Sequence, residues 1–368
     1  MSTVSLSDPE PTRAHWPLGL RQWTPPQALP LEAGGTLPAA TIGYQTWGTL
    51  NAAGDNVVWI CHALSGSSDA AAWWPGLVGP GRTLDPAQHF IVCANVLGSC
   101  YGSAGPTSPG PHGRRWGKAF PEVRIGDMVE QQRLLAAHLG IRRIQCVVGG
   151  SMGGFQALEW AARAPDLVDS LALIASSWRQ PAQAVALAEL QCRLVRTDPA
   201  FADGDYHPAA GPIEGLSLAR QLGHISYRTP DELDQRFGRQ RRADGQFEVS
   251  SYLEHQGRKL VRRFDALSYL RLSAALNAYD FCEGRGEPCF ALKRIRQPVL
   301  VAGLLSDQLY PPGESARLAQ WLPDARLEWI DALAGHDGFL LEGEWFGRLI
   351  ARHLFTPSVG RSLAAVAG

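Results

Sequence analysis

The chain has 368 residues, of which 45% are hydrophobic and 19% are charged, and its 34 basic residues nearly balance 35 acidic ones to give a net charge of −1. This composition suits a globular protein with a sizeable core and excludes disorder for the bulk of the chain. The near-neutral charge, without blocks of one sign, argues against a nucleic-acid or membrane-surface partner, and no apolar run reaches the ~20 residues of a membrane span.

The N-terminal residues are polar, contain prolines and include no hydrophobic stretch, so we expect no signal peptide and a cytoplasmic location. The first third of the chain then alternates short apolar runs with connections rich in glycine and proline. Such runs, with helical patterns between them, predict a parallel sheet that is buried on both faces. The runs lie at 56–61, 89–94, 144–149, 171–175, 298–302 and 326–330.

The sequence pattern changes between about 179 and 293, where strand-like runs give way to helical, charged and aromatic sequence. Alanines and leucines recur at helical spacing over 180–196. A second helical pattern covers 250–280, and its expected buried stripe consists of Tyr252, Leu253, Phe264, Tyr269 and Leu272. These apolar stripes exceed what one small subdomain can bury, so we expect a homodimer formed through these helices.

The predicted fold class is therefore α/β, with a doubly wound, mostly parallel sheet and an inserted helical lid. We place the first part of the core at residues 1–178 and the lid at 179–294. The second part of the core covers 295–356 and ends with a helix over 345–354, and a tail follows at 357–368.

The strongest motif is the run Gly149-Gly-Ser-Met-Gly-Gly154, which contains G-x-S-x-G around Ser151. It directly follows the apolar run 144–149 and precedes a helical pattern over 155–163. This context is typical of a nucleophile elbow, in which a tight strand-to-helix turn presents the serine and the glycines prevent clashes. An ordinary glycine-rich turn that holds a phosphate is the alternative, but the lysine and glycine spacing of nucleotide-binding loops are missing.

A serine hydroxyl needs a base to remove its proton and an acid to orient that base. In the α/β-hydrolase fold these partners follow in the order Ser, Asp, His. Asp307 lies just past the apolar run 298–302, and His336 lies between the next run and the last helix. We therefore predict a catalytic triad of Ser151, Asp307 and His336, against the alternative that Asp307 and His336 are ordinary loop residues.

The same chemistry needs an oxyanion hole. The backbone N–H of Met152 follows the nucleophile, and the N–H of Leu64 lies in the loop after the run 56–61, so these two are the predicted donors. His62 in this loop is expected to pack or orient rather than to act as a second base. Cys100 is interpreted as a buried structural thiol rather than a nucleophile.

No metal site or tightly bound cofactor is predicted. The seven cysteines are scattered and form no C-x-x-C pair, so neither zinc nor a disulfide framework is indicated.

With these residues in view, the chain resembles the homoserine O-acyltransferase family of the α/β-hydrolase superfamily. The resemblance covers about 27 to 354. The run Gly149-Gly-Ser-Met-Gly-Gly-Phe-Gln-Ala-Leu-Glu-Trp160 matches the elbow of that family. Matching blocks also lie at 44–48, 61–64, 73–81, 95–102, 218–228, 237–239, 248–257, 307–312 and 335–337.

The resemblance implies ping-pong transfer of an acyl group from acyl-CoA, through Ser151, to the hydroxyl of homoserine, for methionine biosynthesis. In the family, an arginine of the lid motif and the aspartate after the catalytic histidine bind the amino acid. These positions match Arg220 and Asp337. Their charges suit a carboxylate and an ammonium, respectively. No nucleic acid or membrane is implied as a partner.

The acyl donor is predicted to be acetyl-CoA. Relatives that use succinyl-CoA typically carry an arginine two residues beyond the triad aspartate, where this chain has Leu309. A succinyl carboxylate buried against leucine would lack a partner. Met152 also resembles the family members that use acetyl-CoA, whereas Ser99 is a feature of the members that use succinyl-CoA.

Three hypotheses about the function therefore remain open. The first is a homoserine O-acetyltransferase, and the second is a succinyl-CoA-dependent homoserine or serine O-succinyltransferase. The third is a thioesterase or esterase, in which water accepts the acyl group. A non-catalytic binding protein would be expected to have lost Ser151, Asp307 or His336, and all three are present.

Overall fold

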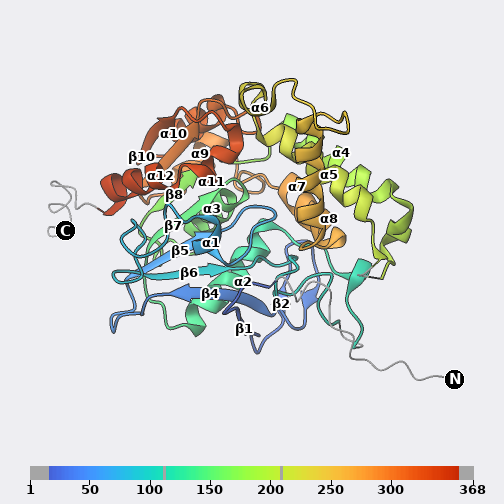
Figure 1. Cartoon of the computed structure of the whole chain (residues 1–368). Coiled ribbons are helices and arrows are strands. Elements are labelled where there is room, and N and C mark those ends of the chain that lie inside the picture. The colour runs from blue at the N-terminus through green and yellow to red at the C-terminus, as the bar shows by residue number, and fades with distance from the viewer. Residues whose placement is uncertain (1–15, 111–112, 208–209, 356–368) are drawn as a thin grey trace, which may run out of the picture.

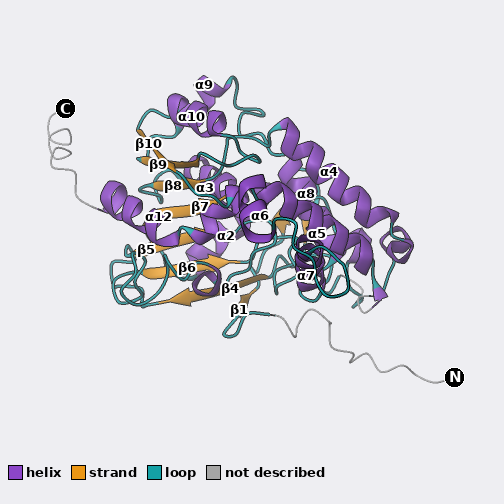
Figure 2. Cartoon of the chain, turned by 45° about the horizontal axis from the view of Figure 1, so that its top comes forward, coloured by secondary structure: helices purple, strands orange, loops and turns teal. Residues whose placement is uncertain are grey.

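The computed structural model describes residues 16–110, 113–207 and 210–355. The predicted tail at 357–368 lies outside these residues. An eight-stranded sheet runs through the molecule (Figure 2). Its neighbouring strands β6, β5, β7, β8, β9 and β10 are parallel to one another. In spatial order its strands are β1 (Arg21–Trp23), β4 (Ile42–Trp47), β6 (Phe90–Ala94), β5 (Val57–Cys61), β7 (Ile144–Gly150), β8 (Leu171–Ile174), β9 (Val299–Leu304) and β10 (Ala325–Ile330).

The two strands at one edge, β1 and β4, run antiparallel to their neighbours, and a separate two-stranded hairpin joins β2 (Leu29–Pro30) to β3 (Thr36–Leu37). The six predicted apolar runs coincide with β5 to β10, so the prediction of a mostly parallel sheet is confirmed. The edge strands β1 and β4 were not predicted, because they are less uniformly apolar than the central ones.

Helices cover both faces of the sheet, and two hydrophobic clusters separate accordingly. In β5, the side chains of Val57 and Trp59 belong to one cluster, and those of Val58 and Ile60 belong to the other. On the first face lie α2 (Ile125–His138), α3 (Met152–Arg163) and α10 (Pro312–Trp321). On the second face lie α1 (Ala70–Trp73), α11 (Gly338–Leu341) and α12 (Gly343–Ile350).

The chain between β8 and β9 forms the helical lid, which lies to one side of the sheet in Figure 1. Within it, α4 packs on α5, and α5 packs on α7. Its main helices are α4 (Ala182–Thr197), α5 (Ile213–Tyr227), α6 (Pro230–Phe237), α7 (Glu248–Val261) and α8 (Ala266–Asn277), and the short α9 (Pro288–Ala291) leads back to the core. Single 3₁₀ turns lie at Gly117–Ala119, Leu292–Arg294 and Gly335–Asp337, and Pro199–Gly204 is a longer 3₁₀ segment with a kink at Ala202 and Asp203.

Two predicted helices differ from the observed ones. The pattern over 250–280 predicts one helix, but the chain breaks into α7 and α8 because Asp265 caps the second helix by accepting a hydrogen bond from the N–H of Ser268 at 2.8 Å. Phe264, Tyr269 and Leu272 of the predicted stripe are buried, whereas Tyr252 and Leu253 are only half-buried. The last α-helix starts at Gly343, and a π-helical turn over Ala351–Phe355 follows it. None of the helices in the described part of the chain has the length and hydropathy to cross a bilayer.

Candidate active site

Ser151 stands in the tight turn between β7 and α3, with φ 56° and ψ −125°. Positive φ is costly for a residue with a side chain, and such strain is typical of a nucleophile elbow. The turn closes because glycines flank it. A Cβ on Gly149 would lie 2.1 Å from the carbonyl oxygen of Gly153, and one on Gly153 would lie 2.2 Å from that of Cys61. The G-x-S-x-G spacing is therefore a steric requirement of this turn.

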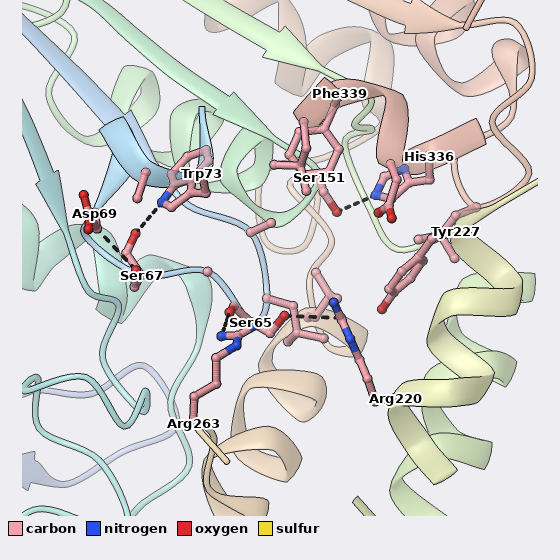
Figure 3. A pocket seen from close by; sticks show the side chains of 18 of the residues that line it. Ser65, Ser67, Asp69, Trp73, Ser151, Arg220, Tyr227, Arg263, His336 and Phe339 are labelled. Atoms are coloured by element: carbon pink, nitrogen blue, oxygen red, sulfur yellow. Dashed lines mark hydrogen bonds between the residues drawn. The ribbon is translucent and has the colours of Figure 1, made fainter. Parts of the chain in front are cut away.

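The three predicted triad residues are brought together at the carboxyl ends of β7, β9 and β10. His336 Nε2 lies 2.9 Å from Ser151 Oγ, and its Nδ1 lies 2.7 Å from Asp307 Oδ2. With the proton on Nδ1, the ring donates to Asp307 and accepts from the serine hydroxyl, as a general base must. Figure 3 shows the serine and the imidazole pointing toward each other.

Asp307 is fixed by its own loop. Its Oδ1 accepts hydrogen bonds from the N–H groups of Leu309 at 2.8 Å and Tyr310 at 2.9 Å, while Oδ2 faces the imidazole. Burial lowers the pKa of His336, but the charge and hydrogen bond of Asp307 and the charge of Asp337 raise it, and the net shift is upward from the ordinary value of 6.5. The imidazole is therefore a stronger base than a free histidine.

The two predicted oxyanion donors lie beside the nucleophile. Met152 opens α3, where the helix N-terminus favours negative charge, and Leu64 is the second residue of a turn closed by a 2.9 Å hydrogen bond from Gly66 N–H to the Ala63 carbonyl. Neither the Leu64 nor the Met152 N–H donates to another residue in the described part of the chain. Both are therefore free to bind a developing oxyanion.

His62 supports this turn. Its Nδ1 lies 2.8 Å from the Ala63 carbonyl, and its Nε2 accepts the N–H of Val96 at 3.0 Å. Burial lowers the pKa of His62 to about 4, so the ring is neutral, and both of its nitrogens are engaged. This placement agrees with an orienting role rather than a second base.

A cavity of about 390 Å³ lies in front of Ser151, between the loops of the core and the lid. The view in Figure 3 places Tyr227 and Arg220 on one side of the serine, and Ser67, Asp69 and Trp73 on the other. The cavity is lined by Pro17, Ala63, Leu64, Ser65, Gly66, Ser67, Asp69, Ala72, Trp73, Tyr101, Ser151, Arg220, Tyr227, Arg263, Leu276, Leu309, Tyr310, His336, Asp337, Phe339 and Leu340.

Arg220 and Asp337 both line this cavity. The Nη1 of Arg220, on α5, lies 3.4 Å from Ser65 Oγ, and its buried Nε has no partner among the described residues. The guanidinium thus keeps donors for a carboxylate. Asp337 directly follows His336, and its Oδ2 lies 3.0 Å from Nε of Arg228. One arginine therefore positions this carboxylate, which retains acceptor sites for an ammonium.

Sequence reasoning missed three further residues here. Arg228, the first of them, pairs with Asp337. Tyr227 lines the cavity, and its ring centroid lies 5.9 Å from that of His336 and 5.8 Å from the Arg220 guanidinium carbon. A separation of seven residues is two helical turns, so the spacing from Arg220 was a usable signal for Tyr227. Arg263 also lines the cavity, and no spacing pointed to it.

The residues relevant to acyl choice are placed differently. Leu309 is buried and lines the cavity, whereas Ser99 is fully buried and is not among the lining residues. Cys100 is buried as well, and burial raises the pKa of its thiol to about 12, so it stays protonated, as expected of a structural cysteine. Among the described residues, no group of three or more His, Cys, Asp or Glu side chains has the arrangement of a metal site.

Comparison with known proteins adds the family context. A family model described as the alpha/beta hydrolase fold matches residues 56–343. The homoserine O-acetyltransferase of Trichormus variabilis is 45% identical over 327 residues, which cover 88% of this chain and 91% of that protein.

Solved structures with the same fold include both transferases and hydrolases. The homoserine O-acetyltransferase of Bacillus anthracis superposes with a TM-score of 0.85 at 24% identity, over 92% of this chain and 97% of that one. An acetylester hydrolase from Corynebacterium glutamicum gives a TM-score of 0.79 at 27% identity, over 91% and 94%. The fold is thus shared by a protein named as a transferase and by one named as a hydrolase.

Proposed function

Because the chain belongs to the homoserine O-acetyltransferase family of the α/β-hydrolase fold, and is therefore an acyltransferase, we propose that it transfers the acetyl group of acetyl-CoA to the hydroxyl of L-homoserine. The products are O-acetyl-L-homoserine, which serves methionine biosynthesis, and CoA. One observation carries the proposal: Ser151 and His336, which Asp307 holds by a hydrogen bond, line a cavity that is also lined by Arg220 and Asp337.

In the first half-reaction, Ser151 Oγ attacks the thioester carbonyl as its proton passes to His336 Nε2. The resulting oxyanion accepts hydrogen bonds from the N–H groups of Leu64 and Met152. The C–S bond then breaks, and His336 returns the proton to the CoA thiolate. Asp307 stabilises the imidazolium in between through the 2.7 Å contact with Nδ1.

In the second half-reaction, the homoserine hydroxyl occupies the position that the thiol has left. His336 takes the hydroxyl proton as the oxygen attacks the acetyl carbonyl, and a second oxyanion forms in the same hole. The bond to Ser151 Oγ then breaks, and the serine regains its proton from His336. No tightly bound cofactor takes part in this sequence, and acetyl-CoA is a substrate.

Recognition of the acceptor is proposed to depend on charge at both ends of the amino acid. The free donors of Arg220 can bind the carboxylate, and Asp337, held by Arg228, can bind the ammonium. Water lacks both groups. This arrangement supports transfer over hydrolysis, although the core machinery would serve either reaction.

Leu309 supports acetyl over succinyl. It lines the cavity with an apolar side chain, and a succinyl carboxylate placed against it would lose its hydration without gaining a partner. Ser99, the residue that favours the succinyl alternative, is fully buried away from the lining. A succinyl-CoA-dependent transferase, which Ser99 favours, is the second candidate.

The experiment for this proposal is intact-mass measurement of the enzyme mixed with acetyl-CoA. We expect a mass increase of one acetyl group that disappears when homoserine is added, with O-acetylhomoserine formed in equal amount. Ser151→Ala should remove the adduct and lower transfer by several orders of magnitude, about 10⁴-fold or more, while the protein stays folded. Substantial transfer by folded Ser151→Ala would contradict the assignment of the nucleophile.

A further inference from the structure

Arg263 reaches from the lid to the loops that carry the active site. It lies in the short connection between α7 and α8, and its Nη1 donates a 2.7 Å hydrogen bond to the backbone carbonyl of Ser65. The same nitrogen donates to the hydroxyl of Tyr101. Figure 3 shows the guanidinium approaching Ser65 from the side of the lid.

The Ser65 carbonyl belongs to the turn that carries the oxyanion donor. Leu64 and Ser65 are the two central residues of the turn from Ala63 to Gly66. In such a turn, the direction of the Leu64 N–H depends on the torsions of its neighbours, and a contact that fixes the Ser65 carbonyl restricts them. A charged donor makes a strong hydrogen bond, so this contact is a firm restraint.

The second partner of Arg263 is itself immobilised. Tyr101 is buried, and its backbone carbonyl accepts a 2.6 Å hydrogen bond from Asn95 Nδ2. The Oδ1 of Asn95 accepts the N–H of Ser68, also at 2.6 Å. Arg263 thus joins two loops of the core that are already tied to each other, and it does so from the lid.

We propose that Arg263 is a positioning residue, which holds the Ser65 carbonyl so that the Leu64 N–H stays directed at the oxyanion of both tetrahedral intermediates. The inference rests on the proposed function for the identity of the substrates, but not for the role of the oxyanion hole. Because Arg263 comes from the lid, the hole is fully ordered only with the lid in this position. Arg220 contacts the same turn at a different atom, the Ser65 hydroxyl.

The test compares Arg263→Met, Arg263→Lys and Arg263→Ala with the control Arg262→Met. Arg262 is the preceding arginine of the same connection, and it is exposed and outside the cavity lining. Each variant is assayed for homoserine-dependent thiol release from acetyl-CoA, for the acylation burst with p-nitrophenyl acetate, and for its melting temperature.

Losing an oxyanion donor costs about 10²–10³ in rate. A donor that is misdirected rather than lost should cost about 10–100-fold, and we expect this in Arg263→Met for kcat of transfer and for the ester burst alike. The KM for homoserine should stay within about twofold, because no ground-state contact is removed. The control Arg262→Met should stay within about twofold of wild type. Added guanidinium should restore part of the rate of Arg263→Ala.

Several results would overturn the proposal. A raised KM for homoserine with an unchanged ester burst would make Arg263 a ligand of the acceptor. Rates that fall only in proportion to a lowered melting temperature would make its role structural, and if Arg263→Met does not fold, Arg263→Lys decides. A wild-type enzyme that reacts with the ester but not with homoserine would refute the proposed function and leave the ester arm to test Arg263.

Discussion

Asp307 and His336 form a buried pair in which each partner fixes the other. The carboxylate accepts from the imidazole and from two backbone N–H groups of its own loop, so it has no freedom to turn away. The imidazole in turn is left with one nitrogen for Ser151. These hydrogen bonds thus orient His336 as a general base before any substrate binds.

The raised pKa of His336 gives a prediction for pH dependence. Acylation of Ser151 needs the neutral imidazole, so the rate should fall as the pH drops through this pKa. The midpoint of the acidic limb of kcat/KM for p-nitrophenyl acetate should therefore lie above 6.5. Asp337→Asn removes one cause of the upward shift and should move the midpoint down. A wild-type midpoint below 6.5 would contradict this electrostatic account.

Leu309 gives a prediction for acyl choice. Leu309→Arg places a cation in the cavity while leaving the backbone N–H that holds Asp307. A hydrogen bond to a charged group contributes about 1.5–3 kcal/mol. The ratio of kcat/KM for succinyl-CoA to that for acetyl-CoA should rise about tenfold or more. Leu305→Arg, at an exposed position of the same loop, is the control and should leave the ratio unchanged. An unchanged ratio in both variants would remove Leu309 from the specificity argument.

Among the elements, the central strands and the elbow were the most predictable parts. Strands β5 to β9 are almost wholly buried, so their sequences are nearly continuously apolar and easy to recognise, whereas the edge strand β10 is largely half-buried or exposed. Because the carboxyl ends of parallel strands meet at one edge, the order of motifs sufficed to bring Ser151, Asp307 and His336 together. Arg228 and Arg263 could not be predicted, since their contacts depend on how the lid folds back onto the core.

A buried ion cluster joins α3 to the segment that returns from the lid. Glu159 contacts Arg285 through both oxygens, at 2.7 and 2.8 Å, and Arg163 at 2.7 Å, and its side chain is 3% exposed. Burial raises the pKa of Glu159, but the two arginines lower it, and the net shift is downward. A depressed pKa contributes stability above the unfolded value of about 4.5, which is lost as the pH falls through the folded value.

Removing this carboxylate should therefore destabilise the fold. Glu159→Ala leaves the partly buried Arg285 guanidinium without a carboxylate partner and leaves Arg163 with Glu32 alone. It should lower the free energy of unfolding by about 3 kcal/mol near neutral pH, measured by urea denaturation. The control is Glu283→Ala, whose exposed carboxylate lies 3.4 Å from Arg124 and should contribute less than about 1 kcal/mol. Equal effects of the two substitutions would argue against a structural role for the cluster.

At the scale of the whole molecule, the lid presents apolar side chains to solvent. Leu190 on α4 and Ile213, Leu218 and Ile225 on α5 are each 45–49% exposed. We propose that this surface forms a homodimer interface, as expected from the excess of apolar stripes. Light scattering at micromolar protein should give twice the mass of one chain. Leu218→Asp with Ile225→Asp should halve it, whereas Leu341→Asp on the core should not. A monomeric wild-type mass would contradict this proposal.

The most direct test of the central claim is thiol release by the purified protein from acetyl-CoA and from succinyl-CoA, each with homoserine, with serine and with no acceptor. In the proposed mechanism, the triad accounts for release, Arg220 and Asp337 for the need for homoserine, and Leu309 for the choice of acyl group. We predict multiple-turnover release that requires homoserine and prefers acetyl-CoA, with only the single equivalent from acylation of Ser151 when no acceptor is present. Preference for succinyl-CoA would contradict the role given to Leu309, and multiple-turnover release without an acceptor would mean that the enzyme is a thioesterase.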